Sequence, residues 1–313
     1  MDRAKQNSAL DTVLMTPFPS VETVFHHAPR SWLKLVGRFF AANIIFWFLV
    51  GCQSMKIDNT HLVEGVAWQL HNNATDPRGN WQKIGANRLL IQWVSVDALS
   101  FLPDTVQPMA PVLPDWQRIA REPWAKEVIL GLAGRFDENA ARKDLKNLID
   151  QSVRIAKLPT PLNVVGWYLP VEIDSNWKEP NKLGPMFHAL PRPLWISVYD
   201  RKNMGAELFA EWLATWLPAD IGVLFQDGVG VEARNAHVAR QYMDALTNRL
   251  GKMRVSVIAE AFRPKPEGGF RSANFDEISK QLIAYRGLSV YLFDGPHYVS
   301  STMVDALQNL SND

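Results

Sequence analysis

Short apolar runs recur along the chain from residue 61 onward, each bounded by turn-forming residues and rich in Val, Ile, Leu and aromatic side chains. Runs of this length and composition predict β-strands, and their nearly continuous hydrophobicity is typical of strands that are covered on both faces. The predicted strands are residues 61–71, 87–97, 127–135, 163–174, 193–200, 221–230, 254–262 and 287–295.

Between the later strands, apolar positions repeat with helical spacing. In residues 141–158, Leu145, Leu148 and Ile149 share one face, and Pro159 ends the pattern. Similar stripes predict helices at residues 204–217, 237–252 and 274–287.

Strands and helices that alternate in this way over about 250 residues predict a single (β/α)8 barrel, the TIM-barrel fold. The connections after the first two strands are the weakest part of the pattern. The first of them is short, and residues 101–115 are rich in proline. A doubly wound open sheet is therefore the alternative.

The chain before residue 61 has a different pattern. A basic stretch, residues 30–38, precedes a mostly apolar run, residues 39–50, which leads to the only cysteine, Cys52. The run is too short to span a bilayer comfortably and has the length of the apolar region of a secretory signal. Its ending resembles the bacterial lipobox, which implies cleavage before Cys52 and acylation of its thiol. Gln53 at the next position implies the outer membrane of a Gram-negative cell, and a buried helix with a chance cysteine is the alternative.

These patterns divide the chain into an N-terminal extension with a lipoprotein signal peptide (residues 1–52), a tether (53–60) and a barrel domain (61–313). The formal net charge of +1 does not indicate nucleic acid as a partner. A single cysteine excludes an intramolecular disulfide and a cysteine-based metal cluster. No metal or other cofactor is expected, because His71 and His297 lack the spacing of a metal site.

In a barrel of this kind, the active site lies at the C-terminal ends of the strands. Those ends carry amides, carboxylates and aromatic side chains, which suit sugar hydroxyls and the faces of sugar rings. The predicted substrate-binding residues are Trp68, Gln69, Gln92, Trp93, Tyr168, Asp174, Trp177, Gln226, Asp227 and Asp294. For the tryptophans the alternative is core packing, and for Asp227 it is a plain turn with the glycines that follow.

Two glutamates end the predicted fourth and seventh strands, Glu172 in "GWYLPVEID" and Glu260 in "VIAEAF". Glycoside hydrolysis needs two carboxyl groups, one to protonate the leaving oxygen and one to attack or to activate water. Both glutamates are therefore candidate catalytic residues. The alternatives are structural: Glu172 in a turn or paired with Lys178, and Glu260 in a buried ion pair with Arg263.

This placement on strands four and seven resembles the clan A glycoside hydrolases. The resemblance implies Glu172 as acid/base and Glu260 as nucleophile of a retaining mechanism. Val171 stands where clan A enzymes usually have asparagine.

The motifs "IQW", "GWYLPVEID", "QDGVG" and "AEAF" are more similar to a bacterial family known as domain of unknown function 4434, over about residues 61–295. That resemblance implies a glycosidase-like TIM barrel without naming a substrate. Two hypotheses follow. One is a lipid-anchored envelope hydrolase that acts on a surface or exported polysaccharide. The other is a non-catalytic lipoprotein that binds glycan or scaffolds polysaccharide export.

Overall fold

A computed structural model describes residues 61–311, which contain a closed barrel of eight parallel strands. Each barrel strand lies within one of the predicted runs. Because β1 pairs with both β2 and β13, the sheet closes, which confirms the TIM barrel and excludes the open sheet. The strands are β1 (Gly65–Trp68), β2 (Arg88–Ile91), β5 (Glu127–Gly131), β7 (Val164–Asp174), β8 (Leu194–Tyr199), β9 (Ile221–Gln226), β10 (Val255–Glu260) and β13 (Val290–Phe293).

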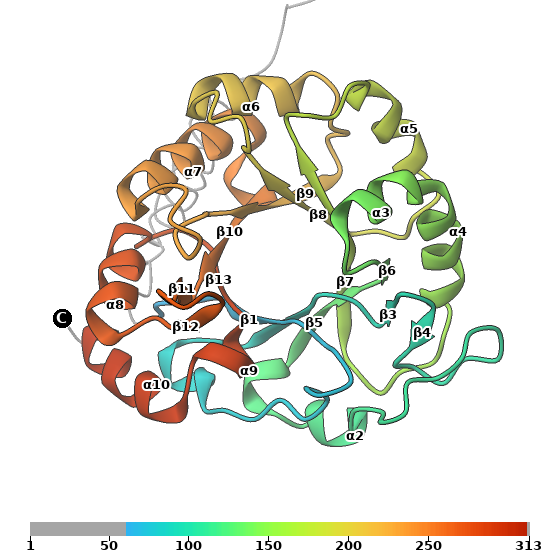
Figure 1. The fold of residues 1–313 in the computed structure, drawn as a ribbon, viewed down its shortest axis with the longest axis horizontal. Helices are drawn as coiled ribbons and strands as arrows, with labels where there is room; N and C mark the ends of the chain where they lie inside the picture. Colours follow the sequence, from blue (N-terminus) through green and yellow to red (C-terminus); the bar gives the residue numbers. More distant parts are fainter. Residues whose placement is uncertain (1–60, 312–313) are drawn as a thin grey trace, which may run out of the picture. The chain divides into compact units, whose positions relative to one another are not determined.

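Helices surround the ring of strands (Figure 1). They are α2 (Trp116–Ile119), α3 (Glu138–Lys143), α4 (Leu145–Ile155), α5 (Leu183–Phe187), α6 (Ala206–Ala214), α7 (Ala236–Leu250), α8 (Phe275–Ala284), α9 (Gly295–Tyr298) and α10 (Ser301–Gln308). Short 3-10 helices occupy Trp81–Ile84, Pro123–Ala125, Pro180–Lys182, Lys252–Arg254 and Asn309–Ser311. No helix in residues 61–311 is long and apolar enough to cross a membrane.

The helix predicted at residues 141–158 is two helices, and the first begins earlier than the pattern indicated. The Asp137 side chain accepts a hydrogen bond from the Ala140 backbone N–H and so caps the start of α3. Asp144, with non-helical backbone angles, separates α3 from α4. This early start places Glu138 in the first turn of α3.

Short strands extend the loops at the C-terminal end of the barrel. Strands β3 (Ser95–Val96), β4 (Leu99–Ser100) and β6 (Ala133–Gly134) form a small sheet after β2 and β5. After β10, β11 (Phe262–Pro264) and β12 (Phe270–Ser272) form a hairpin. These additions lie on opposite sides of the ring in Figure 1.

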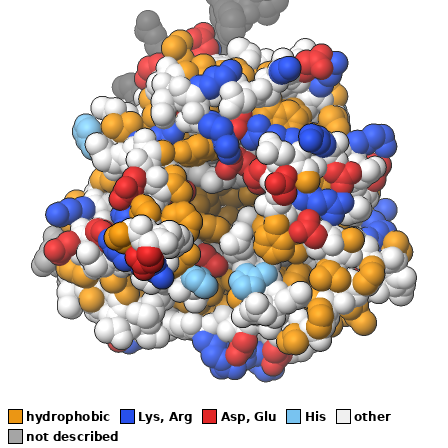
Figure 2. Space-filling view, viewed as in Figure 1, with side chains coloured by type: hydrophobic (Ala, Val, Ile, Leu, Met, Phe, Trp, Pro, Cys, Tyr) orange, Lys and Arg blue, Asp and Glu red, His pale blue; other side chains and the backbone are white. Residues whose placement is uncertain are grey.

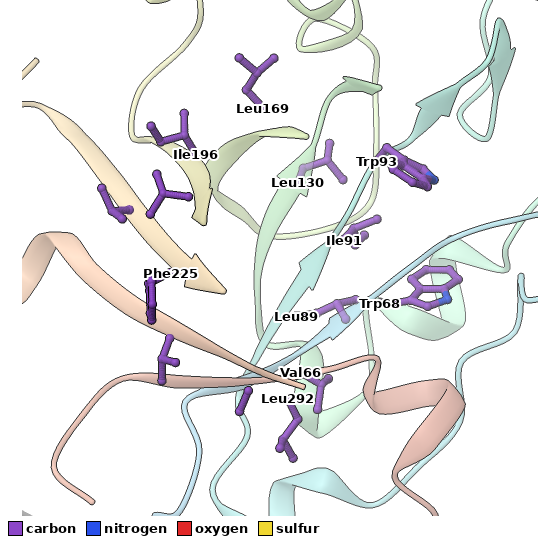
Figure 3. Close-up of a cluster of buried hydrophobic side chains, with 14 of the residues drawn as sticks. Val66, Trp68, Leu89, Ile91, Trp93, Leu130, Leu169, Ile196, Phe225 and Leu292 are labelled. Carbon is purple, nitrogen blue, oxygen red and sulfur yellow. The ribbon is translucent and has the colours of Figure 1, made fainter. Parts of the chain in front are cut away.

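The core has two layers because successive side chains on a strand point to opposite faces. Inside the barrel, a small cluster contains Ala67, Leu90, Ile129, Tyr168, Leu224, Ile258 and Tyr291. A larger cluster lies outside the barrel, between strands and helices, and includes the side chains labelled in Figure 3. The inner cluster forms the floor on which the mouth rests.

Strand β7 is the longest strand of the barrel, and its final residues project beyond its neighbour β5. The register of β5 with β7 ends at Gly131 opposite Tyr168. The register of β7 with β8 shifts between Leu169 and Glu172, then continues to Asp174. Because of this overhang, Glu172 stands at the mouth with one strand edge free of β5.

Candidate active site

The barrel mouth is hollowed at its centre, with an apolar floor and with acidic and basic side chains gathered along one side (Figure 2). A cavity of about 60 Å³ continues into the barrel, which is room for roughly four water molecules or a few hydroxyl groups. Its lining residues are Ala67, Leu90, Gln92, Tyr168, Ser197, Leu224, Gln226, Ile258, Glu260 and Phe293. Glu260 is the acid among them.

Glu260 ends β10 and is 6% exposed. Its Oε2 accepts a hydrogen bond from the Val231 backbone N–H at 3.1 Å. Burial raises the pKa of the Glu260 carboxyl to about 8, and the negative charge of Asp227 adds to this effect. The alternative of an ion pair with Arg263 does not hold, because that guanidinium donates to the backbone carbonyl of Glu260, at 3.1 Å.

Asp227 lies wholly buried behind Glu260 rather than in the cavity. Its carboxylate accepts hydrogen bonds from the Gln281 amide, from the Tyr285 hydroxyl at 2.8 Å, and from the backbone N–H groups of Val229 and Glu260 at 3.1 and 3.3 Å. Burial raises the pKa of Asp227 to about 6. Because four donors stabilise the Asp227 carboxylate, the proton of this pair belongs on Glu260. Asp227 thus lies outside the cavity lining, and its charge favours the protonated form of Glu260.

The loop after β9 requires glycine at position 230, because it passes directly over Glu260. A Cβ at Gly230 would lie 2.6 Å from the Glu260 Cβ and 2.9 Å from its Oε2. No real side chain tolerates contacts that short. The "GVG" of the sequence is thus a tight cover that lets backbone N–H groups reach the carboxyl of Glu260.

Glu172 lies in a very different environment, within β7 and among arginines. Its Oε1 is 2.7 Å from Arg201 Nη2 and 3.9 Å from Arg142 Nη2. No hydrogen bond of the described residues uses its Oε2. Asp174, fully buried, pairs with the same arginines at 2.6 and 3.1 Å. Glu172 therefore forms an ion pair, as the structural alternative predicted, but its partner is Arg201 and not Lys178.

Glu138, which the sequence pattern did not indicate, is a third glutamate at the mouth. Its Oε2 accepts a hydrogen bond from the Glu172 backbone N–H at 3.1 Å. Burial raises the pKa of Glu138 to about 7, and the nearby charge of Glu172 adds to it. The sequence does contain a signal for this residue. Asp137 follows the third predicted strand and is a good N-cap, so a helix that begins after it would include Glu138.

Tyr199 ends β8, one of the two strands that lie between β7 and β10 in the barrel. Burial raises the pKa of its hydroxyl, the charge of Arg234 lowers it, and the charges of Glu260 and Glu172 both raise it. The guanidinium of Arg234 lies 4.9 Å from the ring centre of Tyr199. Glu172 and Glu260 lie at the same end of the barrel, because each stands at or near the C-terminal end of its strand.

The predicted amides and acids at the ends of the first, second, sixth and eighth barrel strands also lie at this end. Gln92 and Gln226 line the cavity, and Gln92 Oε1 is buried without a hydrogen-bond partner among the described residues. Asp294 accepts from the Gln69 backbone N–H, and burial raises its pKa to about 7. Tyr168 lines the cavity and donates to Ser197 Oγ at 2.9 Å.

Two of the predicted tryptophans, Trp68 and Trp93, lie away from the cavity. Trp68 and Trp93 point away from the barrel axis into the outer core, as Figure 3 shows, and both are buried. Their indole N–H groups donate to backbone carbonyls, those of Ala74 at 3.1 Å and Leu70 at 2.6 Å. Trp177 packs against the outer core and under a guanidinium. Strand alternation directs Trp68 and Trp93 to the helix side, so we do not retain these residues as a sugar-stacking surface.

The protein is a (β/α)8-barrel protein that carries acidic side chains at the C-terminal ends of its strands. Within residues 61–311, no group of three or more His, Cys, Asp or Glu side chains is placed to hold a metal ion. The chain belongs to the family described as "Domain of unknown function (DUF4434)", whose profile matches residues 79–301. A search of the curated proteins gives no match.

Solved structures resemble the fold at low sequence identity. A candidate alpha-L-fucosidase from Bacteroides thetaiotaomicron is 17% identical, with 80% of this chain and 93% of that chain covered and a TM-score of 0.52. The glycoside hydrolase domain of PgaB (BpsB) from Bordetella bronchiseptica is 10% identical, with 80% and 99% covered and a TM-score of 0.49. The first likeness shows that this chain has the same barrel fold.

Proposed function

We propose that this protein is a glycoside hydrolase in which Glu260 protonates the leaving oxygen and Glu172 supplies the second carboxylate. The observation that carries this proposal is Glu260, a buried acid with a pKa of about 8 that lines the cavity at the catalytic end of the barrel. A general acid must hold its proton at the working pH, and a buried carboxyl group does so.

Glu172 suits the complementary role because it is paired with cations. An ion pair with Arg201 at 2.7 Å presents a carboxylate, which can attack the sugar or activate a water molecule. Its Oε2 is free of hydrogen bonds to the described residues and is available for that step. These roles are the reverse of those implied by the resemblance to clan A, and they rest on the electrostatics of the two sites.

The proposed substrate is a polysaccharide. The unpartnered Gln92 oxygen and the neighbouring Gln226 suit sugar hydroxyls, and the similar barrel described as an alpha-L-fucosidase supports glycosidic chemistry on this fold. The proposed location is the cell envelope, in a Gram-negative cell the outer membrane, through a lipid on Cys52. Residues 1–60, where the sequence predicts the signal peptide and the tether, lie outside the described residues.

The test is a polysaccharide panel assayed with the wild type, Glu260→Gln and Glu172→Gln. Glu267→Gln is a matched control, because Glu267 is an exposed acid on the β11–β12 turn. We expect turnover by the wild type and by the control, and loss of turnover in both site variants. Product anomers followed by NMR test the retaining mechanism. Full activity of either site variant would overturn the two-carboxylate proposal.

A non-catalytic glycan-binding or export scaffold is the second candidate. Two arginines neutralise Glu172, and Val171 replaces the asparagine of clan A, both of which favour binding over catalysis. Glycan binding by the wild type without turnover on any substrate of the panel would select this function.

The anchor has its own test. Cys52→Ser should move the protein from the membrane fraction to the soluble fraction. Unchanged membrane association of Cys52→Ser would contradict lipidation at this residue, with no bearing on the chemistry of the barrel.

A further inference from the structure

The free edge of β7 raises the question of what holds Glu172 in place. Beyond Tyr168, β7 has no β5 partner, so the backbone groups on that edge need other hydrogen-bond partners. Helix α3 supplies them for Glu172. Glu138 Oε2 accepts from the Glu172 N–H at 3.1 Å, and Arg142 Nη2 donates to the Glu172 carbonyl at 3.1 Å.

Glu138 and Arg142 are four residues apart, so they share one face of α3. One side chain accepts and the other donates, which matches the N–H and C=O of a single strand residue. Arg142 also binds the buried Asp174 at 2.6 Å. The pair therefore replaces the missing strand at the one position where β7 carries a candidate catalytic acid.

We propose that Glu138 is a positioning residue for Glu172, and that it performs this task as a neutral carboxylic acid beside the Glu172 anion. The titratable and charged groups that face Glu138 are Glu172 and Tyr168 from β7, Arg142 from its own helix, and Arg201 after β8. Two acids in one half-buried place cannot both be charged without repulsion, and the arginines lie against Glu172. Only the catalytic part of this role rests on the proposed function.

The protonation of Glu138 predicts in which direction the stability of the fold changes with pH. Burial raises the pKa of Glu138 to about 7 in the folded chain, above its ordinary value. Below its ordinary pKa, Glu138 is protonated in both the folded and unfolded states and costs no stability. As the pH rises towards 7, only the unfolded chain loses this proton, so the folded state becomes relatively less stable. Glu138→Gln keeps an acceptor for the Glu172 N–H but cannot ionise.

The first experiment compares melting temperatures of wild type and Glu138→Gln between pH 5 and pH 8, with Glu267→Gln as an exposed control. We expect the difference in Tm to move in favour of Glu138→Gln by several degrees over this range, and the control to follow the wild type. The same comparison in a Glu172→Gln background should give a smaller change, because the repelling charge is gone. A pH-independent difference, or equal changes in both backgrounds, would overturn the proposal.

The second experiment uses turnover of the substrate found by the panel. Glu138→Gln should retain kcat, whereas Glu138→Leu, which cannot accept the Glu172 N–H, should lose on the order of 10-fold in kcat with little change in KM. Equal kcat values for the two variants would contradict positioning. If no glycan is turned over, the proposed hydrolase fails while the melting experiment still decides the role of Glu138. If Glu138→Leu does not fold, the glutamine variant alone decides it.

Discussion

The two acid centres of the barrel mouth use the same residue type in opposite surroundings. Glu172 stands beside two guanidinium groups, and Asp174 beneath it shares them. Around Glu260, no cation of the described residues comes within ion-pair distance, and the neighbours are backbone N–H groups and the buried Asp227. Arginines surround one glutamate, whereas burial and a neighbouring negative charge favour the protonated form of the other.

This difference is how a protein assigns acid and base roles to chemically identical groups. Opposite charge nearby favours the ionised form, whereas burial and like charge favour the neutral form. The polar partners of the Glu260 centre hold Asp227 as the anion, through Gln281 and Tyr285 on α8 and just after it. The proposed division of labour follows from these surroundings rather than from strand position alone.

The largest expected effect comes from removing the proton of Glu260. Glu260→Gln keeps the shape of a neutral carboxylic acid, so the fold should be as stable as the wild type at neutral pH. Turnover should fall by roughly 10²–10⁴-fold, which is the usual contribution of a general acid. Steady-state kinetics on the substrate from the panel measures this loss.

A substrate with an activated leaving group provides the control for that experiment. Such a leaving group needs little protonation, so the loss in Glu260→Gln should be much smaller on it than on a native glycan. Glu172→Gln should lose activity on both substrates. Equal losses of Glu260→Gln on the two substrates would contradict its role as proton donor.

The next largest effect concerns the arginines beside Glu172 and Asp174, and it is measured as a change in the free energy of unfolding. Arg142→Met removes the closest cation from the fully buried Asp174 and should lower the free energy of unfolding by about 2–4 kcal/mol. Arg201→Met removes a side chain that is 55% exposed and should cost less than about 1 kcal/mol. Urea denaturation midpoints separate these values. An equal cost for both arginines would mean that the network is not anchored by Arg142.

The cover over Glu260 can be disturbed without changing any titratable group. In Gly230→Ala, a Cβ 2.6 Å from that of Glu260 must displace the acid or the loop, and turnover should fall on the order of 10-fold. Gly166→Ala is the matched control, because a Cβ there meets nothing closer than 3.4 Å. Similar kinetics for the two alanine variants would show that the close cover does not position Glu260.

The strand pattern predicted the barrel and placed Glu172, Glu260 and the rim amides at its C-terminal end, because apolar runs and strand ends are local features. It failed for Trp68 and Trp93, which directly follow the inward-facing residues Ala67 and Gln92 and therefore point to the outer side of the sheet. In the sequence, both tryptophans come at the end of an apolar run, as a residue at the barrel mouth would. In the structure, their side chains lie on the face of the sheet that the helices cover.

The side chains that contact each acid could not be predicted from the sequence. Arg201 meets Glu172 from the next strand's end, and Glu138 reaches it because β7 overhangs β5. Such contacts depend on register shifts and helix starts that a one-dimensional pattern does not contain. Neither the ion pair with Lys178 nor the one with Arg263 forms, because nearness along the chain is a poor guide to contact across a barrel.

The smallest expected effect concerns the charge behind Glu260. Asp227→Asn removes a negative charge that raises the pKa of Glu260, so this pKa should fall. If activity needs protonated Glu260, the alkaline limb of the pH profile should then move to lower pH by about one unit. Asparagine leaves one of the Asp227 donors unpaired, which should cost about 1–3 kcal/mol, so folding is first verified by circular dichroism. Glu267→Gln should leave the profile unchanged. A folded Asp227→Asn enzyme whose alkaline limb stays in place, or moves upward, would show that Asp227 does not set the proton affinity of Glu260.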